Sequence, residues 1–300
     1  MRDAAQTLRA DIDRCLDRSL DALLPTAPGR LVEAMRYSLL APGKRLRPML
    51  VVLACRAAGG DPSAAIHAGC AVEMIHTYSL IHDDLPAMDD DDLRRGIPTC
   101  HRKFGEAMGI LAGDALLTLA FETLASSYPP KIASVCIKEL AVGAGASGMV
   151  GGQVLDLAAE GRIEGIAVPR TLDDLEKIHL GKTGGLYRAS LRMGLAVARA
   201  DTENGIPESL TIAFDRFSRG FGLAFQIADD LLDVESSSEL EGKRVGKDAA
   251  RGKLTFPGLM GIDASRTLAA NLYREAIDSL AGIGPLAEPL AELARQRIRG

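Results

Sequence analysis

The sequence predicts an all-α fold in one domain spanning residues 1–300. Apolar residues recur with a helical period through most of the chain, and alternating strand patterns are scarce. The composition is 47% hydrophobic with no Trp, so the core must consist mainly of aliphatic residues and Met, which are mostly good helix formers. The breaks between predicted helices are too short and too varied in composition to be interdomain linkers.

In the first third of the chain, three predicted helices lead to a group of aspartates. Apolar residues between 31 and 40 share one helical face, and a second helix continues after Pro48, which a first helical turn tolerates. Asp61, followed by proline, then supplies an N-cap and a fixed φ for a long helix. That helix runs to Asp83, and Pro86 ends it.

Further helices follow in the remaining two thirds. The most apolar stretches, 109–124 and 217–234, are expected to be buried on nearly all sides, which predicts a large bundle around a central helix pair. The predicted helices cover about residues 105–127, 130–158, 171–199, 207–235, 250–262, 266–281 and 285–298.

Two aspartate clusters, residues 83–89 (DDLPAMD) and 229–233 (DDLLD), are the most informative feature of the chain. Each follows an apolar helix and is predicted to lie at its C-terminal end, where the helix dipole favours cations. Carboxylate oxygens suit Mg²⁺, which is usually shared with substrate phosphates. One such string alone would be typical of a solvated helix end, but two predict a multi-Mg²⁺ site for a diphosphate, with Mn²⁺ as the other possible metal.

The spacing within each cluster predicts which aspartates share an ion. Asp229 and Asp233 are four residues apart on one helix face, whereas Asp230 points about 100° away. Asp83 and Asp89 cannot share a regular helical face. The proline between them breaks the helix, so Asp89 could return from the loop to the same ion.

Basic residues near the clusters are candidates for binding diphosphates, since Arg clamps phosphate bidentately and Lys acts as a point charge. The GKTGG stretch at 181–185 lacks the P-loop spacing and follows no strand, which argues against nucleotide binding. The candidates, with the threonine of that stretch, are Arg94, Arg95, Lys182, Thr183, Lys243 and Lys253.

Six motifs in order resemble those of the trans-isoprenyl diphosphate synthases, and most closely those of bacterial farnesyl diphosphate synthases. They run from GKRLRP at 43–48, through the stretch 75–96 and GKTGG, to FQIADD at 225–230 and GKLTFP at 252–257. The resemblance covers nearly the whole chain. It implies a large single-domain helical bundle around a central active-site cavity, three Mg²⁺ ions and a homodimer.

The resemblance also implies a role for each binding residue. Asp83 and Asp89 are the principal ligands at the first cluster, with Asp84 in support, and Asp229 and Asp233 are the pair at the second. Three residues match the family's site for the homoallylic diphosphate, namely Lys44, Arg47 and His76. The other basic candidates would bind the allylic diphosphate and its ions.

The activity that the resemblance implies is a (2E,6E)-farnesyl diphosphate synthase, which joins isopentenyl diphosphate to dimethylallyl and then geranyl diphosphate. Lys182 and Thr183 would sit at a break in a helix and, with Gln226, stabilise the allylic carbocation. Tyr78 and Ser79 would set the chain length, because an aromatic at this position goes with short products. The alternative product is geranylgeranyl or geranyl diphosphate.

Two other classes fit less well. A class I terpene cyclase would have a second metal motif of Asn/Asp-Ser/Thr-Glu type, and here that motif is a second aspartate triple. A non-catalytic prenyltransferase subunit would have lost aspartates or basic residues that this chain retains.

Composition excludes several partners. The net charge of −5 argues against nucleic acid, which needs a basic face. Five cysteines without a CxxC pair signal neither a disulfide framework nor a zinc site. The N-terminus lacks a signal-peptide pattern, and no uncharged apolar run reaches the roughly 18 residues of a membrane helix. We therefore expect a cytoplasmic protein without a membrane span.

Overall fold

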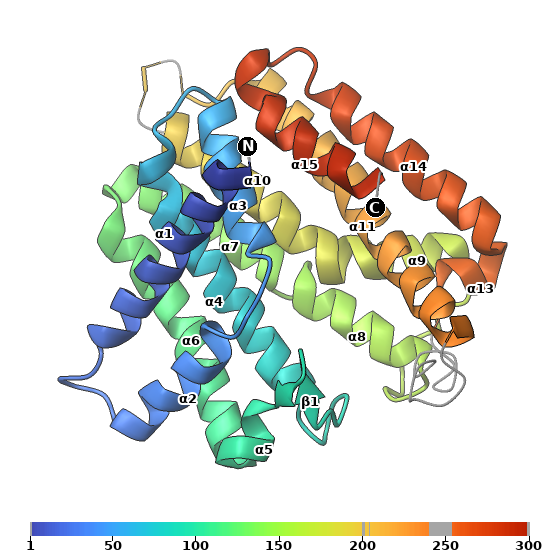
Figure 1. Cartoon of the computed structure of the whole chain (residues 1–300), viewed down its shortest axis with the longest axis horizontal. Helices are drawn as coiled ribbons and strands as arrows, with labels where there is room; N and C mark the ends of the chain where they lie inside the picture. The colour runs from blue at the N-terminus through green and yellow to red at the C-terminus, as the bar shows by residue number, and fades with distance from the viewer. Residues whose placement is uncertain (1, 200–201, 204, 240–253, 299–300) are drawn as a thin grey trace. The chain divides into compact units, whose positions relative to one another are not determined.

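The computed structural model describes residues 2–199, 202–203, 205–239 and 254–298, and it confirms the all-α prediction (Figure 1). In these residues the only strands are β1 (Leu93–Arg94) and β2 (Ile97–Pro98), which pair antiparallel. The chain divides into two compact units, residues 1–138 with 193–205 and residues 139–192 with 206–300. The single domain stays a prediction.

The first unit is organised around α4 (Ile66–Asp83), which Asp61 and the 3-10 turn η1 (Pro62–Ala65) introduce. Asp61 accepts a hydrogen bond from the Ser63 amide, as its predicted capping role requires. Helix α4 is buried along most of its length and packs against α1, α3 and α6. The other helices of this unit are α1 (Arg2–Asp21), α2 (Gly29–Leu39), α3 (Leu46–Ala57), α5 (Cys100–Phe104) and α6 (Glu106–Ser127).

The second unit is organised around α11 (Glu208–Glu239), which packs against α9, α13 and α14. One of its buried clusters joins Leu175, Ile227, Leu231, Phe256 and Ala269. Helices α7 (Pro130–Ala144) and α10 (Gly185–Arg199) contribute residues to both units. The remaining elements are α8 (Met149–Ala159), α9 (Leu172–His179), the π-helical turn η2 (Leu180–Gly184), α13 (Phe256–Met260), α14 (Ile262–Ser279), the 3-10 turn η3 (Pro285–Ala287) and α15 (Glu288–Ile298).

Four predicted helices differ from the structure. Of the predicted helix 250–262, the described residues 254–261 form only the short α13, which ends at Met260, before its C-cap Gly261. The stretch 130–158 is two helices, because the chain breaks at residues 145–148, which include two glycines. The stretch 171–199 is interrupted by the π-helical turn. Helix α11 runs on to Glu239, so the second aspartate cluster lies inside the helix and not at its end. The helix-dipole reason given for a cation therefore fails there, since the effect is confined to the last turn.

Two helical stretches, Glu106–Ser127 and Pro130–Ala159, are long and apolar enough to cross a membrane by length and composition alone. Core helices of soluble proteins have the same character. The apolar character of α6 is explained by packing, because Ala112, Leu116 and Ala120 are buried and the helix packs against α4.

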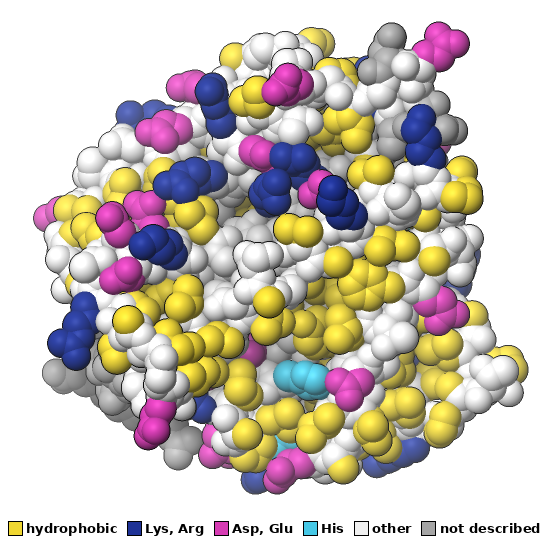
Figure 2. Space-filling model, turned by 180° about the vertical axis from the view of Figure 1, so that it is seen from behind, with side chains coloured by type: hydrophobic (Ala, Val, Ile, Leu, Met, Phe, Trp, Pro, Cys, Tyr) yellow, Lys and Arg dark blue, Asp and Glu magenta, His cyan; other side chains and the backbone are white. Residues whose placement is uncertain are grey.

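On the face of the molecule that Figure 2 shows, Lys and Arg side chains lie among Asp and Glu side chains.

Candidate active site

The loop after α4 folds back on the end of the helix. The Asp89 amide donates a hydrogen bond of 2.8 Å to the Asp83 carbonyl, and the Asp91 amide donates one of 3.2 Å to the Asp84 carbonyl. Asp89 therefore returns to the backbone of Asp83, as the proline break predicted. Two carboxylate-bearing residues six positions apart lie side by side at the end of α4.

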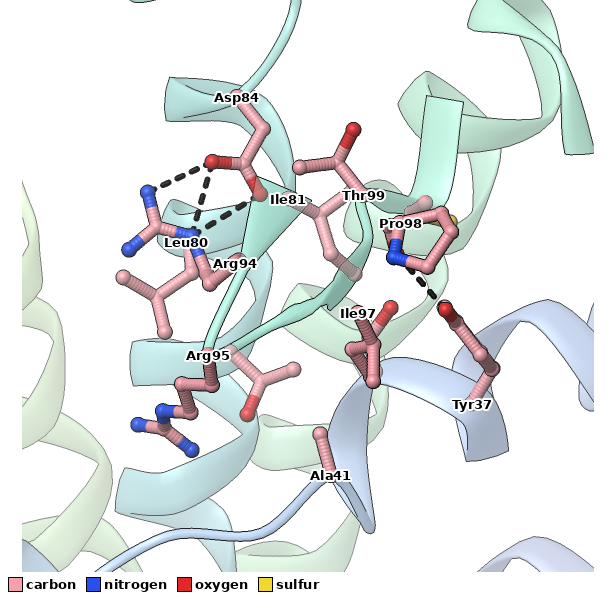
Figure 3. A pocket seen from close by; sticks show the side chains of 13 residues that line it. Tyr37, Ala41, Leu80, Ile81, Asp84, Arg94, Arg95, Ile97, Pro98 and Thr99 are labelled. Atoms are coloured by element: carbon pink, nitrogen blue, oxygen red, sulfur yellow. Dashed lines mark hydrogen bonds and ion pairs between the residues drawn. The ribbon is translucent and has the colours of Figure 1, made fainter. Parts of the chain in front are cut away.

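Asp84 is buried and paired with Arg94 of β1 (Figure 3). Arg94 Nε donates to both carboxylate oxygens at 2.8 and 3.0 Å, and its Nη2 donates to one of them at 2.6 Å. Burial raises the pKa of Asp84, and the Arg94 guanidinium opposes this rise. In this structure Asp84 and Arg94, both predicted ligands, bind each other and anchor the β1–β2 hairpin to α4.

The segment that carries Lys44 and Arg47 is fixed by the residue between them. Arg45 has a left-handed backbone, with φ of 49°, and directly precedes α3. Its buried guanidinium donates to Asp13 of α1 at 2.7 Å and to Glu73 of α4 at 2.9 Å. Sequence reasoning missed Arg45, although a third cation inside the GKRLRP motif was the visible signal.

His76 of α4 lies in the electrostatic field of four arginines. Its pKa is held well below the ordinary value of 6.5 by burial and then by Arg47, Arg95, Arg94 and Arg45. The imidazole is therefore neutral at pH 7. Two of the four arginines are balanced by carboxylates, since Arg45 binds Asp13 and Glu73 and Arg94 binds Asp84, so the net charge around His76 is positive but smaller than four. Arg47, His76 and the Arg94–Arg95 pair, predicted separately from three motifs, are brought together on the first unit, and their combined charge suits a diphosphate.

Gly43 makes room for Arg95 in this cluster. Arg95 Nη1 donates a 2.6 Å hydrogen bond to the Pro42 carbonyl, and a Cβ on Gly43 would lie 2.6 Å from the same nitrogen. Any larger residue at this position must displace the guanidinium. The glycine of the GKRLRP motif thus shapes the cationic surface and does not merely permit a turn.

In the second unit, the π-helical turn η2 carries Lys182 and Thr183, at the helix break that the resemblance implied. Lys182 Nζ donates a 2.5 Å hydrogen bond to Asp156 of α8, whose side chain is buried. Sequence reasoning missed Asp156. A carboxylate in the otherwise uncharged run 149–159 was its signal, because such a charge needs a partner.

Backbone packing explains the position of the turn. A Cβ on Gly152 of α8 would lie 2.1 Å from the Lys182 amide nitrogen, and Gly152 Cα already lies 3.0 Å from the position of a Cβ on Gly181. Only glycines allow α8 and η2 to approach this closely. The contact holds the Lys182 backbone against α8 one turn before Asp156, and π-helical turns are frequent at functional sites.

A chain of hydrogen bonds connects the turn to the second aspartate cluster. Thr183 Oγ1 donates to Gln226 Oε1 at 3.2 Å, and Gln226 Nε2 donates to Asp230 Oδ1 at 3.2 Å. The other Asp230 oxygen accepts from the Phe256 amide at 3.2 Å. Asp230 is buried and points away from the exposed Asp229 and Asp233, as helix geometry predicted.

Carboxylates suit a divalent cation at both clusters, but neither is a complete cage. Among the residues that the structure describes, no three His, Cys, Asp or Glu side chains form a group able to hold a metal. Mg²⁺ commonly takes only one or two carboxylates and completes its shell with water and substrate phosphates, so the donor sets fit that metal. Lys243 and Lys253 lie outside the described residues.

The two chain-length candidates lie on α4. Tyr78 is 8% exposed, and its ring meets His82 edge-on with centroids 5.7 Å apart. Burial, and then the Asp83 charge, raise the pKa of Tyr78. Ser79 donates to the His76 carbonyl at 2.8 Å. Tyr78 is thus a buried aromatic about 7.5 Å along the helix axis from Asp83.

Comparison with known proteins identifies the family. The sequence model of the polyprenyl synthetase family matches residues 28–281, and the chain belongs to that family. The large subunit 1 of a heterodimeric chloroplastic geranylgeranyl pyrophosphate synthase of Arabidopsis thaliana is 47% identical over 89% of this chain and 71% of its own. A chloroplastic geranylgeranyl pyrophosphate synthase of Catharanthus roseus is also 47% identical, over 91% of this chain and 75% of its own.

A solved structure extends the likeness to the fold. The apo FPP/GFPP synthase of Zymomonas mobilis superposes with a TM-score of 0.85 and 40% identity, covering 99% of this chain and 98% of its own. The chain is therefore a prenyltransferase of the prenyl diphosphate synthase class with the helical fold of isoprenoid synthases.

Proposed function

We propose that this chain is a Mg²⁺-dependent synthase that extends allylic diphosphates with isopentenyl diphosphate. The observation that carries the proposal is that Arg94 joins two features of α4: it pairs with Asp84 at the loop that returns Asp89 to Asp83, and its charge also acts on His76 with those of three other arginines. A carboxylate loop suited to a divalent cation, on the same helix as a group of arginines, fits two diphosphates better than one. The positive cluster would bind isopentenyl diphosphate through Arg47, His76 and the exposed Lys44.

The chain's own residues have defined tasks in this reaction. Asp83, Asp89, Asp229 and Asp233 would hold Mg²⁺, which when bound neutralises the leaving diphosphate and favours ionisation of the allylic C–O bond. Thr183 and Gln226 would present oxygen dipoles to the resulting allylic cation.

The new bond and the proton balance follow from the substrates. The alkene of isopentenyl diphosphate attacks C1 of the allylic cation, and the departed diphosphate takes the proton that restores the double bond. Lys182 keeps its ammonium in place through Asp156 and would contact the departing diphosphate. No covalent nucleophile from the protein is needed.

Geranylgeranyl diphosphate is the product that we propose. The curated relatives at 47–48% identity are named geranylgeranyl pyrophosphate synthases. The product would then arise from three condensations, with dimethylallyl, geranyl and farnesyl diphosphate as successive allylic substrates.

Farnesyl diphosphate is a second candidate product, and Tyr78 favours it. A buried aromatic about a turn and a half before Asp83 would close the tail cavity early. The solved Zymomonas mobilis relative is named an FPP/GFPP synthase, which also includes the fifteen-carbon product.

Product chromatography decides between the two. Purified protein would be given dimethylallyl diphosphate and radiolabelled isopentenyl diphosphate, with and without EDTA. Twenty-carbon product supports the main proposal, and fifteen-carbon product supports the second. If Tyr78 forms the floor, Tyr78→Ala lengthens the product and Tyr78→Phe, the matched control, does not. Conversion of a long prenyl diphosphate alone into a hydrocarbon would instead indicate a terpene cyclase, and inactivity in Mg²⁺ or Mn²⁺ a non-catalytic subunit.

Steady-state kinetics tests the assignment of the two diphosphates. Arg47→Ala or His76→Ala is expected mainly to raise the KM for isopentenyl diphosphate. Lys182→Ala is expected mainly to lower turnover of the allylic substrate. The reverse pattern would show that the two sites are exchanged.

A homodimer and a cytoplasmic location belong to the same proposal. The family resemblance supports the dimer, and the free state of all five cysteines supports the location. Sedimentation equilibrium of the purified chain tests the first, and fractionation of the producing cell tests the second.

A further inference from the structure

Two cysteines and a histidine meet between α1 and α4, within the first unit and apart from the residues assigned to prenyl transfer. Cys15 of α1 is partly exposed, and its Sγ lies 3.5 Å from Nδ1 of His67 on α4. A thiol in contact with an imidazole is the arrangement that activates cysteine, because the thiolate is the reactive form.

The second thiol lies in the same helix contact. Cys70 is fully buried, and its Sγ is 3.8 Å from the carbonyl oxygen of Ile12. Ile12 and Cys15 are one turn apart on α1, and His67 and Cys70 are one turn apart on α4. The two contacts therefore cross one interface side by side, and they place both thiols within it.

The charges around Cys15 favour its thiolate. The pKa of Cys15 is lowered to about 5, first by a hydrogen bond from the Cys70 thiol, against the opposing effect of burial, and then by His67 and Arg18. The hydrogen bond with Cys15 in turn raises the pKa of His67. Cys55 provides a contrast, since burial and then Asp61 raise its pKa to about 11.

We propose that Cys15 is a peroxide-reactive thiol and that Cys70 resolves its oxidised form into a reversible disulfide that links α1 to α4. The Cys15 thiolate attacks one oxygen of hydrogen peroxide, the O–O bond breaks, and hydroxide leaves to give a sulfenic acid. Cys70 sulfur then attacks the sulfenic sulfur, and the sulfenic oxygen leaves with the Cys70 proton as water. The two thiols supply two electrons, and one peroxide becomes two waters once the hydroxide takes the first thiol proton.

The link would act on helices that hold the cationic cluster. Asp13 of α1 and Glu73 of α4 both bind Arg45, and each lies within three residues of one of the two cysteines. A disulfide would fix α1 against α4 where these two carboxylates share one guanidinium. Any effect of the disulfide on catalysis rests on the proposed function. The formation of the disulfide does not.

Peptide mapping of the full chain tests the chemistry without any variant. The reduced protein would be titrated with hydrogen peroxide, alkylated with iodoacetamide, digested and analysed by mass spectrometry. We expect a Cys15–Cys70 linked peptide that dithiothreitol removes, at peroxide concentrations that leave Cys55 alkylatable. In the reduced protein, Cys15 should be alkylated roughly tenfold faster than Cys55 or more.

Variants separate the two roles. Cys15→Ser should abolish both the linked peptide and any rise in thermal midpoint on oxidation. Cys70→Ser should leave Cys15 as a sulfenic acid or a higher oxide. The proposal fails if oxidised wild type carries only added oxygen on Cys15 without the linked peptide, or if Cys15 reacts no faster than Cys55. Prenyl transfer by reduced Cys15→Ser should match wild type, so loss of the cross-link is distinguishable from loss of activity.

Discussion

The two aspartate clusters bring a pair of carboxylate residues together with different backbone structures. At the first, α4 ends and a proline loop returns Asp89 to Asp83, with the Asp89 amide bonded to the Asp83 carbonyl. At the second, α11 continues unbroken and brings Asp229 and Asp233 to one face by helical spacing. A carboxylate pair can therefore be built by a turn over six residues or by a helix over four.

Each cluster also contains one buried aspartate that serves the fold. Asp84 is 3% exposed and pairs with Arg94, and Asp230 is 4% exposed and binds Gln226 and the Phe256 amide. In both cases it is the second residue of the Asp-Asp pair. The comparison teaches that adjacent aspartates have different roles, since the second of each pair is buried and fixes the helix or loop, whereas Asp229 and Asp233 of the second cluster are exposed.

The largest expected effect comes from the ligand aspartates. Asp83→Ala, Asp89→Ala and Asp229→Ala should each lower kcat by roughly 10²–10³, because loss of a major electrostatic contact costs about 3–4 kcal/mol. Circular dichroism should stay that of the wild type. Asp91→Ala is the control and should change kcat far less. Near-normal turnover of all three variants in Mg²⁺ would contradict the two-cluster assignment.

The buried aspartates should instead affect stability, and unequally. Asp84→Asn leaves the partly buried Arg94 without its ion-pair partner, which should lower the free energy of unfolding by about 1–3 kcal/mol. Asp230→Asn keeps one carbonyl acceptor for two neutral donors and should cost about 1 kcal/mol. Urea titration measures both. A larger loss at Asp230 would mean that the amide network, and not the ion pair, is the stronger anchor.

Two glycines sharpen the contrast between the cationic cluster and the π-helical turn. Gly152→Ala places its Cβ against backbone of η2, which cannot yield without moving α8, so about 1–3 kcal/mol of stability and much of the turnover should be lost. Gly43→Ala meets the flexible end of Arg95 at 2.6 Å and otherwise only Arg45 Nη1, at an ordinary contact distance of 3.4 Å. It should leave the thermal midpoint near wild type and raise the KM for isopentenyl diphosphate several-fold, roughly 1 kcal/mol of binding.

The last expected effect is a pH dependence from His76, which is absent at pH 7. Its folded pKa lies well below 6.5, while unfolded His76 takes up a proton near that pH, so the unfolded state binds more protons. The free energy of unfolding should therefore fall as pH drops below about 6.5, by up to about 1.4 kcal/mol per pH unit from this residue, and be unaffected by it above that pH. His76→Gln should show a shallower fall in urea titrations from pH 7 to 5. An identical slope would place His76 in a less positive environment.

The sequence predicted those features that depend on residues only a few positions apart. The direction of Asp230 follows from about 100° per helical residue, and the return of Asp89 follows from a proline three residues after Asp83. Sequence also placed most helices correctly. Helix α1 was not predicted, nor was the β1–β2 hairpin, whose two-residue strands are too short to show alternation.

What sequence missed depends on contacts between distant residues. The Lys182–Asp156 pair spans 26 positions and exists only because α8 and η2 pack glycine on backbone. The Asp13–Arg45–Glu73 bridge likewise needs three elements to meet. For the product length, the two kinds of evidence differ, since Tyr78 favours fifteen carbons while the relatives are named for twenty.

The π-helical turn has a consequence for the number of residues in the segment between α9 and α10. Such a turn accommodates one residue more than an α-helical turn, and one residue rotates everything after it by about 100°. Deleting one residue from Leu180–Gly184 would leave a smoother helix with Lys182 or its neighbours turned off Asp156. The extra residue in the turn is therefore not needed for regular helical packing. It is needed to keep the Lys182 ammonium beside Asp156.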